Sequence, residues 1–341
     1  MKLINPVAQM IKKHLGNSDL KICPIVFGAW AIGGSGWGGN AEKDSLEAIE
    51  TAIDAGLSSF DTAPIYGYGR SEELLGRIIS KKRNRAHLEI FTKCGLNWNI
   101  EKGEFYFKGN FNNKDYSVYK YNGKDGIIKE CEDSLKRLST DYIDLYQIHR
   151  PENITADEEV MEALGRLQEQ GKIRYAGVSN YDLKKLKNSN KHLSLVSNQM
   201  PYSMLERGIE KEMMPFYIEN GIGILAYSPL QRGVLSGKYK GEIEWNDDDH
   251  RKDTIWFQNE NLRIINAFLD RISDIAKGKG ASLSQIVLQW TLNQKGISAV
   301  LAGARNATQI LENINSLDFH LDQNEIELIN IELNKVSLTE H

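Results

Sequence analysis

The alternation of short apolar segments with longer helical segments limits what this chain can fold into. Eight segments rich in Val, Ile, Phe and Tyr have the length of buried strands, and they span residues 24–27, 58–61, 88–93, 143–149, 173–179, 193–199, 223–228 and 298–303. Segments of helical periodicity follow them, at 44–55, 71–80, 126–138, 155–170, 182–188, 206–219, 283–293 and 306–316. Strands that alternate with helices are typical of parallel sheets, and eight such units predict a closed (β/α)8 barrel, the TIM barrel architecture.

The length of 341 residues taken alone would suggest about two domains of roughly 150 residues. However, no linker rich in Pro, Gly or Ser and no shift in composition divides the chain. We therefore predict one barrel domain over residues 1–341. The elements outside the minimal barrel are predicted as an N-terminal hairpin at 12–23 that seals the bottom, long loops at 95–124 and 231–257 after strands 3 and 7, a helix at 259–277 and a C-terminal tail helix at 323–335.

Composition excludes several classes of function. The chain has 42 Lys and Arg against 46 Asp and Glu, interspersed along the sequence, so we predict no nucleic-acid partner. No apolar run reaches the roughly 20 residues that span a bilayer, and the first 16 residues lack the apolar core of a secretory signal. The three cysteines have no metal-ligand spacing. We expect a cytoplasmic protein with no membrane association, no disulfide framework and no metal site.

A glycine-rich segment, AIGGSGWGGN at 31–40, invites a specific functional interpretation. Gly34, Gly36 and Gly39 satisfy G-x-G-x-x-G, the fingerprint of Rossmann dinucleotide-binding domains. That fingerprint requires the first glycine to follow a strand directly and the third to open a helix. Here the predicted strand ends at residue 27, and the next helix is predicted to begin near Asp44. We therefore favour a turning loop whose glycines adopt unusual backbone angles or approach a ligand closely, with a Rossmann site as the alternative.

Four titratable side chains follow the C-terminal ends of neighbouring predicted strands, where TIM barrels place reactive groups. Asp61 ends the second strand, Tyr66 lies in the loop after it, Lys93 ends the third and His149 ends the fourth. Each alone fits an ordinary structural role. Together they suit carbonyl reduction, because a lysine can stabilise a tyrosinate, an aspartate can pair with that lysine, and a neutral histidine can hydrogen-bond a carbonyl oxygen. Such a set needs a hydride-bearing cofactor as the reductant.

Several longer motifs carry a family resemblance. They are DTAPIYGYGRSEELLG from residue 61, FTKCG around residue 93, LKRLSTDYIDLYQIHRP through residue 149, GVSN at 177–180, AYSPLQRGVLSGKY from residue 226 and AGARNATQILENI from residue 302. With these motifs in order, the chain resembles the aldo-keto reductases over nearly its whole length, and most closely bacterial branches associated with aldose, inositol and general aldehyde turnover. The resemblance implies a barrel that binds an extended nicotinamide dinucleotide without a Rossmann domain. It also implies that Tyr66 is the proton donor and that Lys93, Asp61 and His149 complete a catalytic tetrad.

The resemblance further assigns cofactor-binding residues. Ser179, Asn180 and Gln199 match positions that hydrogen-bond the nicotinamide carboxamide, and Tyr227 matches the aromatic residue that stacks on the nicotinamide ring. The pyrophosphate segment comprises Ser228, Leu230, Arg232, Gly233, Leu235 and Lys238. The adenosine end comprises Gly303, Ala304, Arg305, Gln309, Glu312 and Asn313.

The adenosine end departs from the better-known pattern of the family. Many members carry a Lys-Ser pair where this chain has Gly303 and Ala304, and an Arg where it has Gln309. Only Arg305 is left to pair with a 2′-phosphate. We therefore predict NADP(H) as the cofactor and leave NAD(H) open.

Substrate and assembly are less constrained. Trp30 and Trp98 match positions that commonly wall the substrate pocket of the family. Aromatic walls with polar groups suit a sugar or polyol, and also an aromatic aldehyde, so we expect a small carbonyl substrate and favour a sugar. The aromatic residues of loop 95–124 are expected to form a hairpin packed on the barrel rim. The alternatives are a cofactor-binding regulatory subunit, as the β-subunits of potassium channels are within this family, and an NAD-dependent sugar or polyol dehydrogenase; we expect a monomer or a weak oligomer.

Overall fold

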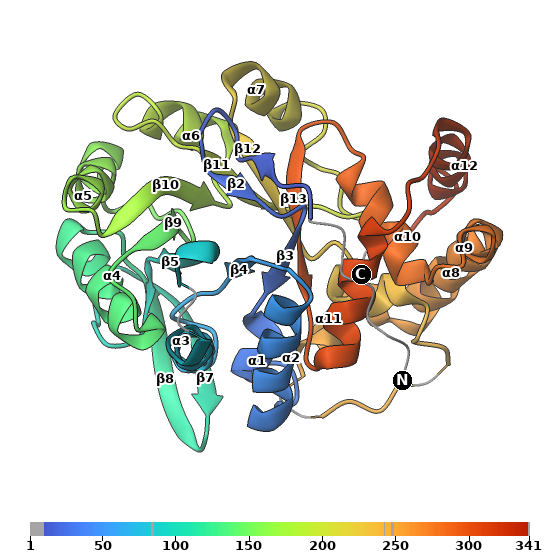
Figure 1. The fold of residues 1–341 in the computed structure, drawn as a ribbon, viewed down its shortest axis with the longest axis horizontal. Helices are drawn as coiled ribbons and strands as arrows, with labels where there is room; N and C mark the ends of the chain where they lie inside the picture. Colours follow the sequence, from blue (N-terminus) through green and yellow to red (C-terminus); the bar gives the residue numbers. More distant parts are fainter. Residues whose placement is uncertain (1–9, 83–84, 242, 247–248, 340–341) are drawn as a thin grey trace.

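A closed barrel of eight parallel strands forms the centre of the molecule. The computed structural model describes residues 10–82, 85–241, 243–246 and 249–339. In chain order the barrel strands are β3 (Ile25–Gly28), β4 (Ser59–Asp61), β5 (Glu89–Cys94), β9 (Ile143–Ile148), β10 (Ile173–Ser179), β11 (Ser197–Pro201), β12 (Gly223–Tyr227) and β13 (Ile297–Gly303). Each strand pairs in parallel with the next, and β13 pairs with β3 to close the ring (Figure 1). The prediction of a (β/α)8 barrel is confirmed.

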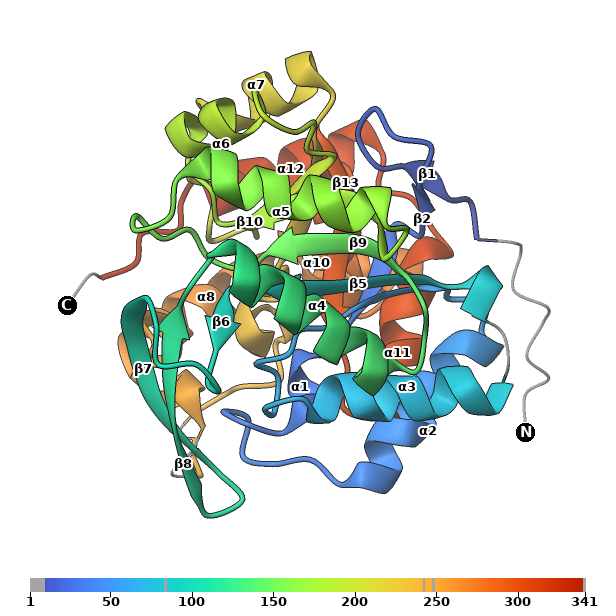
Figure 2. The same ribbon diagram turned by 90° about the vertical axis from the view of Figure 1, so that its left-hand side faces the viewer.

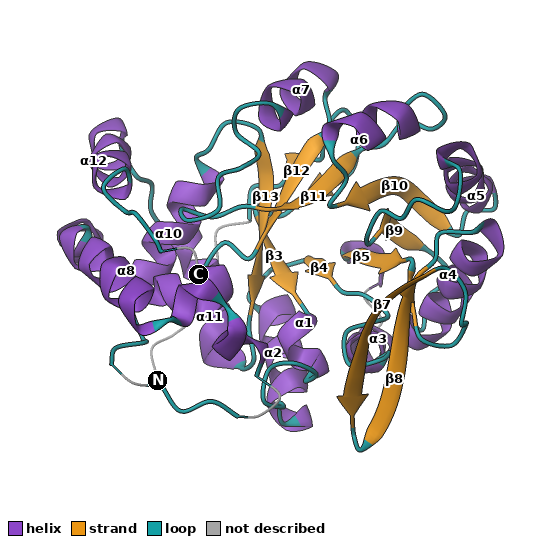
Figure 3. Cartoon of the chain, turned by 180° about the vertical axis from the view of Figure 1, so that it is seen from behind, coloured by secondary structure: helices purple, strands orange, loops and turns teal. Residues whose placement is uncertain are grey.

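Helices surround the strands (Figure 3). Those that follow barrel strands are α2 (Glu42–Asp54), α3 (Arg70–Lys82), α4 (Lys124–Leu138), α5 (Asp157–Glu169), α6 (Leu183–Ser189), α7 (Met213–Asn220), α10 (Leu283–Leu292) and α11 (Ala307–Ile314). A short helix α1 (Trp30–Gly33), the pair α8 (Asn259–Arg271) and α9 (Ser273–Lys279), and the tail helix α12 (Gln323–Leu333) are additions to this pattern. Ser282 and Asp322 begin α10 and α12 with complete capping boxes, which satisfy the first backbone N–H groups of each helix.

Apolar side chains fill two layers. The larger layer lies between the strands and the helices, and it includes Phe27 on β3, Phe60 on β4 and Ile49 on α2. The smaller layer fills the barrel interior, where Phe91 and Leu225 pack with residues of the N-terminal hairpin. Both layers are buried from solvent, so the strands expose little except their ends.

The N-terminal hairpin closes one end of the barrel. Strands β1 (Lys13–His14) and β2 (Lys21–Ile22) pair antiparallel. Leu15, Leu20 and Ile22 from this hairpin belong to the interior apolar layer, as the sequence predicted for a seal at the bottom. Ligands must therefore enter at the opposite end, where the strands have their C-terminal ends.

A second hairpin rises from the loop after β5. It contains β7 (Glu104–Phe111) and β8 (Lys114–Lys120), and β8 also pairs with β6 (Leu96–Asn97). The turn residues Asn112 and Asn113 both have positive φ, which matches the right-handed twist of a two-residue hairpin. The hairpin lies at the end of the barrel opposite β1 and β2 and extends outward from it (Figure 2). The expected hairpin is confirmed, although much of it projects beyond the rim.

Some predicted boundaries were wrong. The strand predicted at 193–199 begins only at Ser197, because the N–H of Leu195 donates to the side chain of Asn190 instead of to a neighbouring strand. The helix predicted at 206–219 begins at Met213, since residues 203–206 form an isolated antiparallel bridge. The helix predicted at 259–277 is divided into α8 and α9 at Ile272, where ψ is 0°.

The glycine-rich segment is a turning loop. Gly34, Gly36, Gly38 and Gly39 all have positive φ, and α2 begins only at Glu42. The third glycine of the fingerprint therefore does not open a helix, and the sheet is a closed barrel. The Rossmann alternative is wrong, and the interpretation as a loop with unusual backbone angles is confirmed.

The backbone beside Tyr66 provides a test of this local packing. Gly67 has a φ of +64°, and an added Cβ would lie 2.2 Å from the carbonyl oxygen of Gly33. Gly56 also has a positive φ, +86°, but an added Cβ there would meet nothing within 4 Å. We expect Gly56→Ala to lose about 1–2 kcal/mol of unfolding free energy through backbone strain alone, and Gly67→Ala to lose clearly more. Urea unfolding of both variants measures the difference; equal losses would mean that the contact with Gly33 does not constrain this loop.

Candidate active site

The side chains of the predicted tetrad meet at the C-terminal ends of three adjacent strands. Asp61 ends β4, Lys93 lies near the end of β5, and His149 follows β9. Because β4 pairs with β5 and β5 with β9, these ends lie side by side. Tyr66 returns to the same place through tight turns in which its N–H donates to the carbonyl of Ala63.

Lys93 connects this group. Its Nζ atom donates to Asp61 Oδ2 at 2.6 Å, to the Thr62 carbonyl at 2.8 Å and to the Tyr66 hydroxyl at 3.3 Å. The side chains of Lys93 and Asp61 are 0% and 3% exposed. The ammonium therefore has no water to solvate it, and three protein oxygens replace that hydration.

The charge states follow from this packing. Burial lowers the pKa of Lys93, but the charge of Asp61 and contacts with Tyr66 outweigh it, so the net shift is upward and the ammonium form is kept. Burial raises the pKa of Tyr66, and the opposing effect of Lys93 does not cancel that rise. Tyr66 is therefore a neutral phenol at neutral pH, with a cation in place to stabilise its phenolate.

His149 stands beside Tyr66, with the two rings edge to face and 5.7 Å between their centroids. Burial lowers the pKa of His149 well below 6.5, and the nearby charges of Lys93 and Arg150 lower it further. The imidazole is therefore neutral, and it can donate a hydrogen bond to an oxygen placed near the Tyr66 hydroxyl.

Two glutamines complete the surroundings of Asp61. Gln199 Nε2 donates to Asp61 Oδ1 at 2.9 Å, and Gln147 Nε2 approaches the same oxygen at 3.3 Å. Sequence reasoning placed Gln199 against the nicotinamide and missed Gln147. The available signal was the two-residue spacing of Gln147 and His149, since alternate residues of a strand point to the same face.

The residues predicted to bind nicotinamide form a connected group. The Tyr227 hydroxyl donates to Asn180 Oδ1 at 2.8 Å, and Asn180 Nδ2 donates to the Ser179 hydroxyl at 2.8 Å and to the His149 carbonyl at 3.1 Å. Asn180 has a φ of +60°, which turns the chain at the end of β10. The structure thus places these residues directly beside the tetrad.

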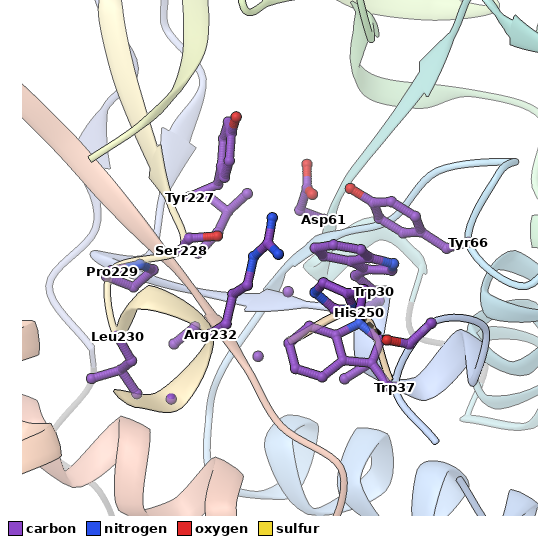
Figure 4. Close-up of a pocket in the computed structure, with 18 of the residues that line it drawn as sticks. Trp30, Trp37, Asp61, Tyr66, Tyr227, Ser228, Pro229, Leu230, Arg232 and His250 are labelled. Carbon is purple, nitrogen blue, oxygen red and sulfur yellow. Dashed lines mark hydrogen bonds between the residues drawn. The ribbon is translucent and has the colours of Figure 1, made fainter. Parts of the chain in front are cut away.

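One cavity of about 690 Å³ extends from the tetrad to the N-terminal region of α11, a size typical of small-molecule sites. Figure 4 shows Tyr66, Trp30, His250 and Trp37 on one side of it and the segment from Tyr227 to Arg232 on the other. Of the predicted cofactor residues, the lining includes Ser179, Asn180, Gln199, Tyr227, Ser228, Leu230, Arg232, Gly233, Lys238, Gly303, Arg305, Gln309, Glu312 and Asn313. The side chains of Leu235 and Ala304 are instead buried in the core, so only their backbones could approach a ligand.

The cavity fits an extended dinucleotide in its distribution of charge. Arg232 lines the middle and has a φ of +57°, followed by Gly233 at +98°, so the backbone turns sharply there. Arg305 lies at the far end, where its N–H donates to Gln309 Oε1 and its guanidinium donates to the Gly39 carbonyl. Glu312 accepts hydrogen bonds from Ser282 and Lys238. Cationic side chains spaced along the cavity suit the phosphates of such a cofactor.

Aromatic side chains form the outer wall near Tyr66. Trp30 stacks on Tyr66 and on His250, with centroid separations of 6.0 and 5.0 Å, and Trp37 packs edge-on against both Trp30 and His250. Trp30 lines the cavity as predicted, and sequence reasoning missed His250. Trp98 does not line the cavity, contrary to the prediction. It packs edge-on against Tyr68, and Tyr68 does line the cavity.

Comparisons with known proteins agree with this fold. The model of the Aldo/keto reductase family matches residues 24–333. Aldo-keto reductase YhdN of Bacillus subtilis is 35% identical, over 87% of this chain and 85% of the relative. The NADH-specific methylglyoxal reductase of Escherichia coli is 31% identical, over 94% of this chain and 97% of the relative. Among solved structures, a glycerol dehydrogenase from Gluconobacter oxydans has a TM-score of 0.85 and 32% identity, with 97% of each chain covered.

A barrel that gathers a tyrosine, a lysine, an aspartate and a histidine beside one cavity has the groups that carbonyl reduction needs. Since the family model also covers nearly the whole sequence, the chain belongs to the aldo/keto reductase family. It is an NAD(P)H-dependent carbonyl oxidoreductase, in a family that acts on small carbonyl substrates. Within the part of the chain that the structure describes, no helix is both long and apolar enough to cross a bilayer.

The neutral state of His149 predicts a pH dependence of stability. Because its folded pKa lies below the ordinary 6.5, the unfolded chain binds a proton that the folded chain does not. Unfolding free energy should therefore fall as pH drops below 6.5, by up to about 1.4 kcal/mol per pH unit from this residue. We expect His149→Asn to flatten this dependence in urea unfolding between pH 7.5 and 5, while the same change at the exposed His192 keeps it. An unchanged slope in His149→Asn would mean that His149 is protonated in the fold.

Proposed function

We propose that this protein is an NADP(H)-dependent oxidoreductase that transfers hydride between the nicotinamide and the carbonyl carbon of an aldehyde, ketone or sugar, with Tyr66 as general acid and base. The observation that carries the proposal is the position of Lys93, whose buried ammonium contacts both Asp61 and the Tyr66 hydroxyl behind the cavity wall that these two residues line. Besides replacing hydration of the ammonium, this contact stabilises the phenolate that forms when the tyrosine gives up its proton.

The chain's own groups account for the proton side of the reaction. The Tyr66 hydroxyl donates its proton to the carbonyl oxygen, while a bound nicotinamide cofactor supplies the hydride. Lys93 stabilises the phenolate that forms, and Asp61 holds Lys93 in place. His149 donates a hydrogen bond to the same carbonyl oxygen and polarises it. In the oxidation direction the tyrosinate accepts the proton from the alcohol.

The residues around Asn180 would hold the nicotinamide. Ser179, Asn180 and Gln199 supply polar groups for the carboxamide, and the ring of Tyr227 supplies a stacking surface. Gln199 already donates to Asp61, so its carbonyl oxygen is the group available to a carboxamide N–H. This arrangement would place the nicotinamide close to Tyr66 and His149.

Removal of the Tyr66 hydroxyl tests the proposal directly. We expect Tyr66→Phe to lower kcat for aldehyde reduction by about 100- to 10,000-fold, the usual contribution of a general acid. The dissociation constant of the cofactor, measured by fluorescence titration, should change little because the ring is retained. Tyr119→Phe on β8 is the matched control and should keep full activity. Undiminished turnover in Tyr66→Phe would remove this residue from the mechanism.

NAD(H) is the second candidate cofactor, and one observation favours it. Among the six residues predicted for the adenosine end, Arg305 alone is cationic, and its guanidinium already contacts the Gly39 carbonyl. The E. coli relative is named as NADH-specific. Gly303 is exposed, and an added Cβ would lie 3.8 Å from the Gly28 carbonyl oxygen, so a side chain fits there.

These features make cofactor choice testable. If NADP(H) is the cofactor, Arg305→Met should weaken NADPH binding by about 10- to 100-fold and leave NADH binding nearly unchanged, because only the 2′-phosphate loses a partner. Gly303→Lys should tighten NADPH binding selectively. The dissociation constants of NADPH and NADH, determined for the wild type and both variants, measure these effects. A wild type that binds NADH at least as tightly as NADPH, with no selective effect of Arg305→Met, would establish NAD(H) instead.

The substrate we propose is a small carbonyl compound, with a sugar favoured. Trp30 stacked on His250, with Trp37 edge-on against both, gives the cavity aromatic walls, which bind the apolar faces of sugars as well as aromatic aldehydes. A screen of aldoses, ketoses and aromatic aldehydes distinguishes the two groups. The proposed assembly is a monomer or a weak oligomer.

A further inference from the structure

The cavity is rich in positive charge. Its lining includes the cationic side chains Arg150, Arg232, Lys238, Arg251 and Arg305. The lining carboxylates are Asp61 and Glu312, and both are engaged: Asp61 pairs with Lys93 at 2.6 Å, and Glu312 lies 3.5 Å from Lys238. A cavity of this kind favours anionic ligands, and the phosphates of a dinucleotide explain only part of its charge.

Most of these cations already have a partner or a place along the proposed cofactor. Arg251 pairs with Asp249 at 2.6 Å. Arg232 and Lys238 belong to the segment proposed to hold the pyrophosphate, and Arg305 lies at the adenosine end. Arg150 has neither an acidic partner nor a place along the proposed phosphates. It follows His149 directly, at the end of the cavity opposite Arg305.

Contacts around Arg150 place its charge beside the reacting groups. The Tyr227 hydroxyl donates to Asn180, and Asn180 donates to the carbonyl of His149, the residue that directly precedes Arg150. Burial raises the pKa of Tyr227, and the Arg150 guanidinium opposes that rise through charge and a hydrogen bond. The Arg150 carbonyl accepts a hydrogen bond from Asn122, which fixes the backbone at this point.

Arg150 forms no ion pair with any carboxylate of the described residues. The nearest acidic residue in the sequence, Glu152, is buried and uses its carboxylate to accept from the N–H groups of Asn122, Ile154 and Thr155. A partly exposed guanidinium in the lining that has no carboxylate partner can pair with an anionic group of a ligand.

We infer that Arg150 binds an anionic group, a carboxylate or a phosphate, on the carbonyl substrate. This inference rests on the proposed function and specifies its substrate class. The planar guanidinium offers parallel N–H donors that match two oxygens of such a group. Tyr106 and Phe107 of the outer hairpin also line the cavity, and they supply apolar surface for the carbon skeleton between the carbonyl and the anion. The substrate class is therefore an acidic or phosphorylated aldehyde, ketone or sugar.

Three para-substituted benzaldehydes test the inference. They are 4-carboxybenzaldehyde, 4-formylphenyl phosphate and the neutral 4-carbamoylbenzaldehyde. The wild type should reduce at least one anion with a higher kcat/KM than the amide, and the better anion identifies the group. Arg150→Met should lower kcat/KM for that anion by about 10- to 100-fold, the value of a charge-assisted hydrogen-bonded pair, and change the amide much less. Arg150→Lys keeps the charge but lacks the planar guanidinium. Its kcat/KM for that anion should lie between the values of the wild type and Arg150→Met.

Controls separate this inference from the proposed function. Arg263→Met on the exposed face of α8 removes the same charge outside the cavity and should leave all three rates unchanged. If Arg150→Met lowers kcat/KM for the anionic aldehydes and for the amide equally, or mainly weakens NADPH binding in fluorescence titration, the inference is wrong while the proposed function stands. If the wild type prefers the amide, the inference is also wrong. If the wild type reduces none of the three aldehydes and no aldehyde or sugar in the wider screen, the proposed function itself fails.

Discussion

The buried ion pair of Lys93 and Asp61 is the contact on which the site depends. Both side chains are almost fully removed from water, so each charge is stable only while the other is present. Loss of one partner from such a pair typically costs about 3–5 kcal/mol. Replacement of both by apolar residues is often neutral or stabilising, so the pair contributes little net stability to the barrel. Its value is positional, because it fixes an ammonium 3.3 Å from the Tyr66 hydroxyl.

Much of the architecture could be predicted because its physical signals are local. Buried strands produce apolar runs, and each candidate site residue at a strand end follows such a run directly, as Asp61, Lys93 and His149 do. The errors arose where one side chain redirects the backbone. The Asn190 side chain takes the N–H of Leu195, which delays the start of β11, and no periodicity reports a contact of that kind.

The missed parts of the site depend on contacts between distant segments. Gln147 and Gln199 meet at Asp61 because β9, β11 and β4 lie around one barrel, and barrel closure is not visible in any window of sequence. Likewise His250 lies against Trp30 although 220 positions separate them, and its Nδ1 donates to the Gly36 carbonyl. A loop without periodicity gives no sequence signal for such a partner.

The glycine-rich loop has a function that differs from the one its pattern suggests. Its carbonyls at Gly36 and Gly39 accept hydrogen bonds from His250 and Arg305, which belong to the loops after β12 and β13. The first strand–helix unit therefore contacts the last two across the cavity. Arg305 is also the cation proposed to recognise a 2′-phosphate, and its guanidinium keeps further N–H donors besides the one that the Gly39 carbonyl accepts. The proposed selectivity between the two cofactors therefore rests on a side chain that the glycine-rich loop already holds in place.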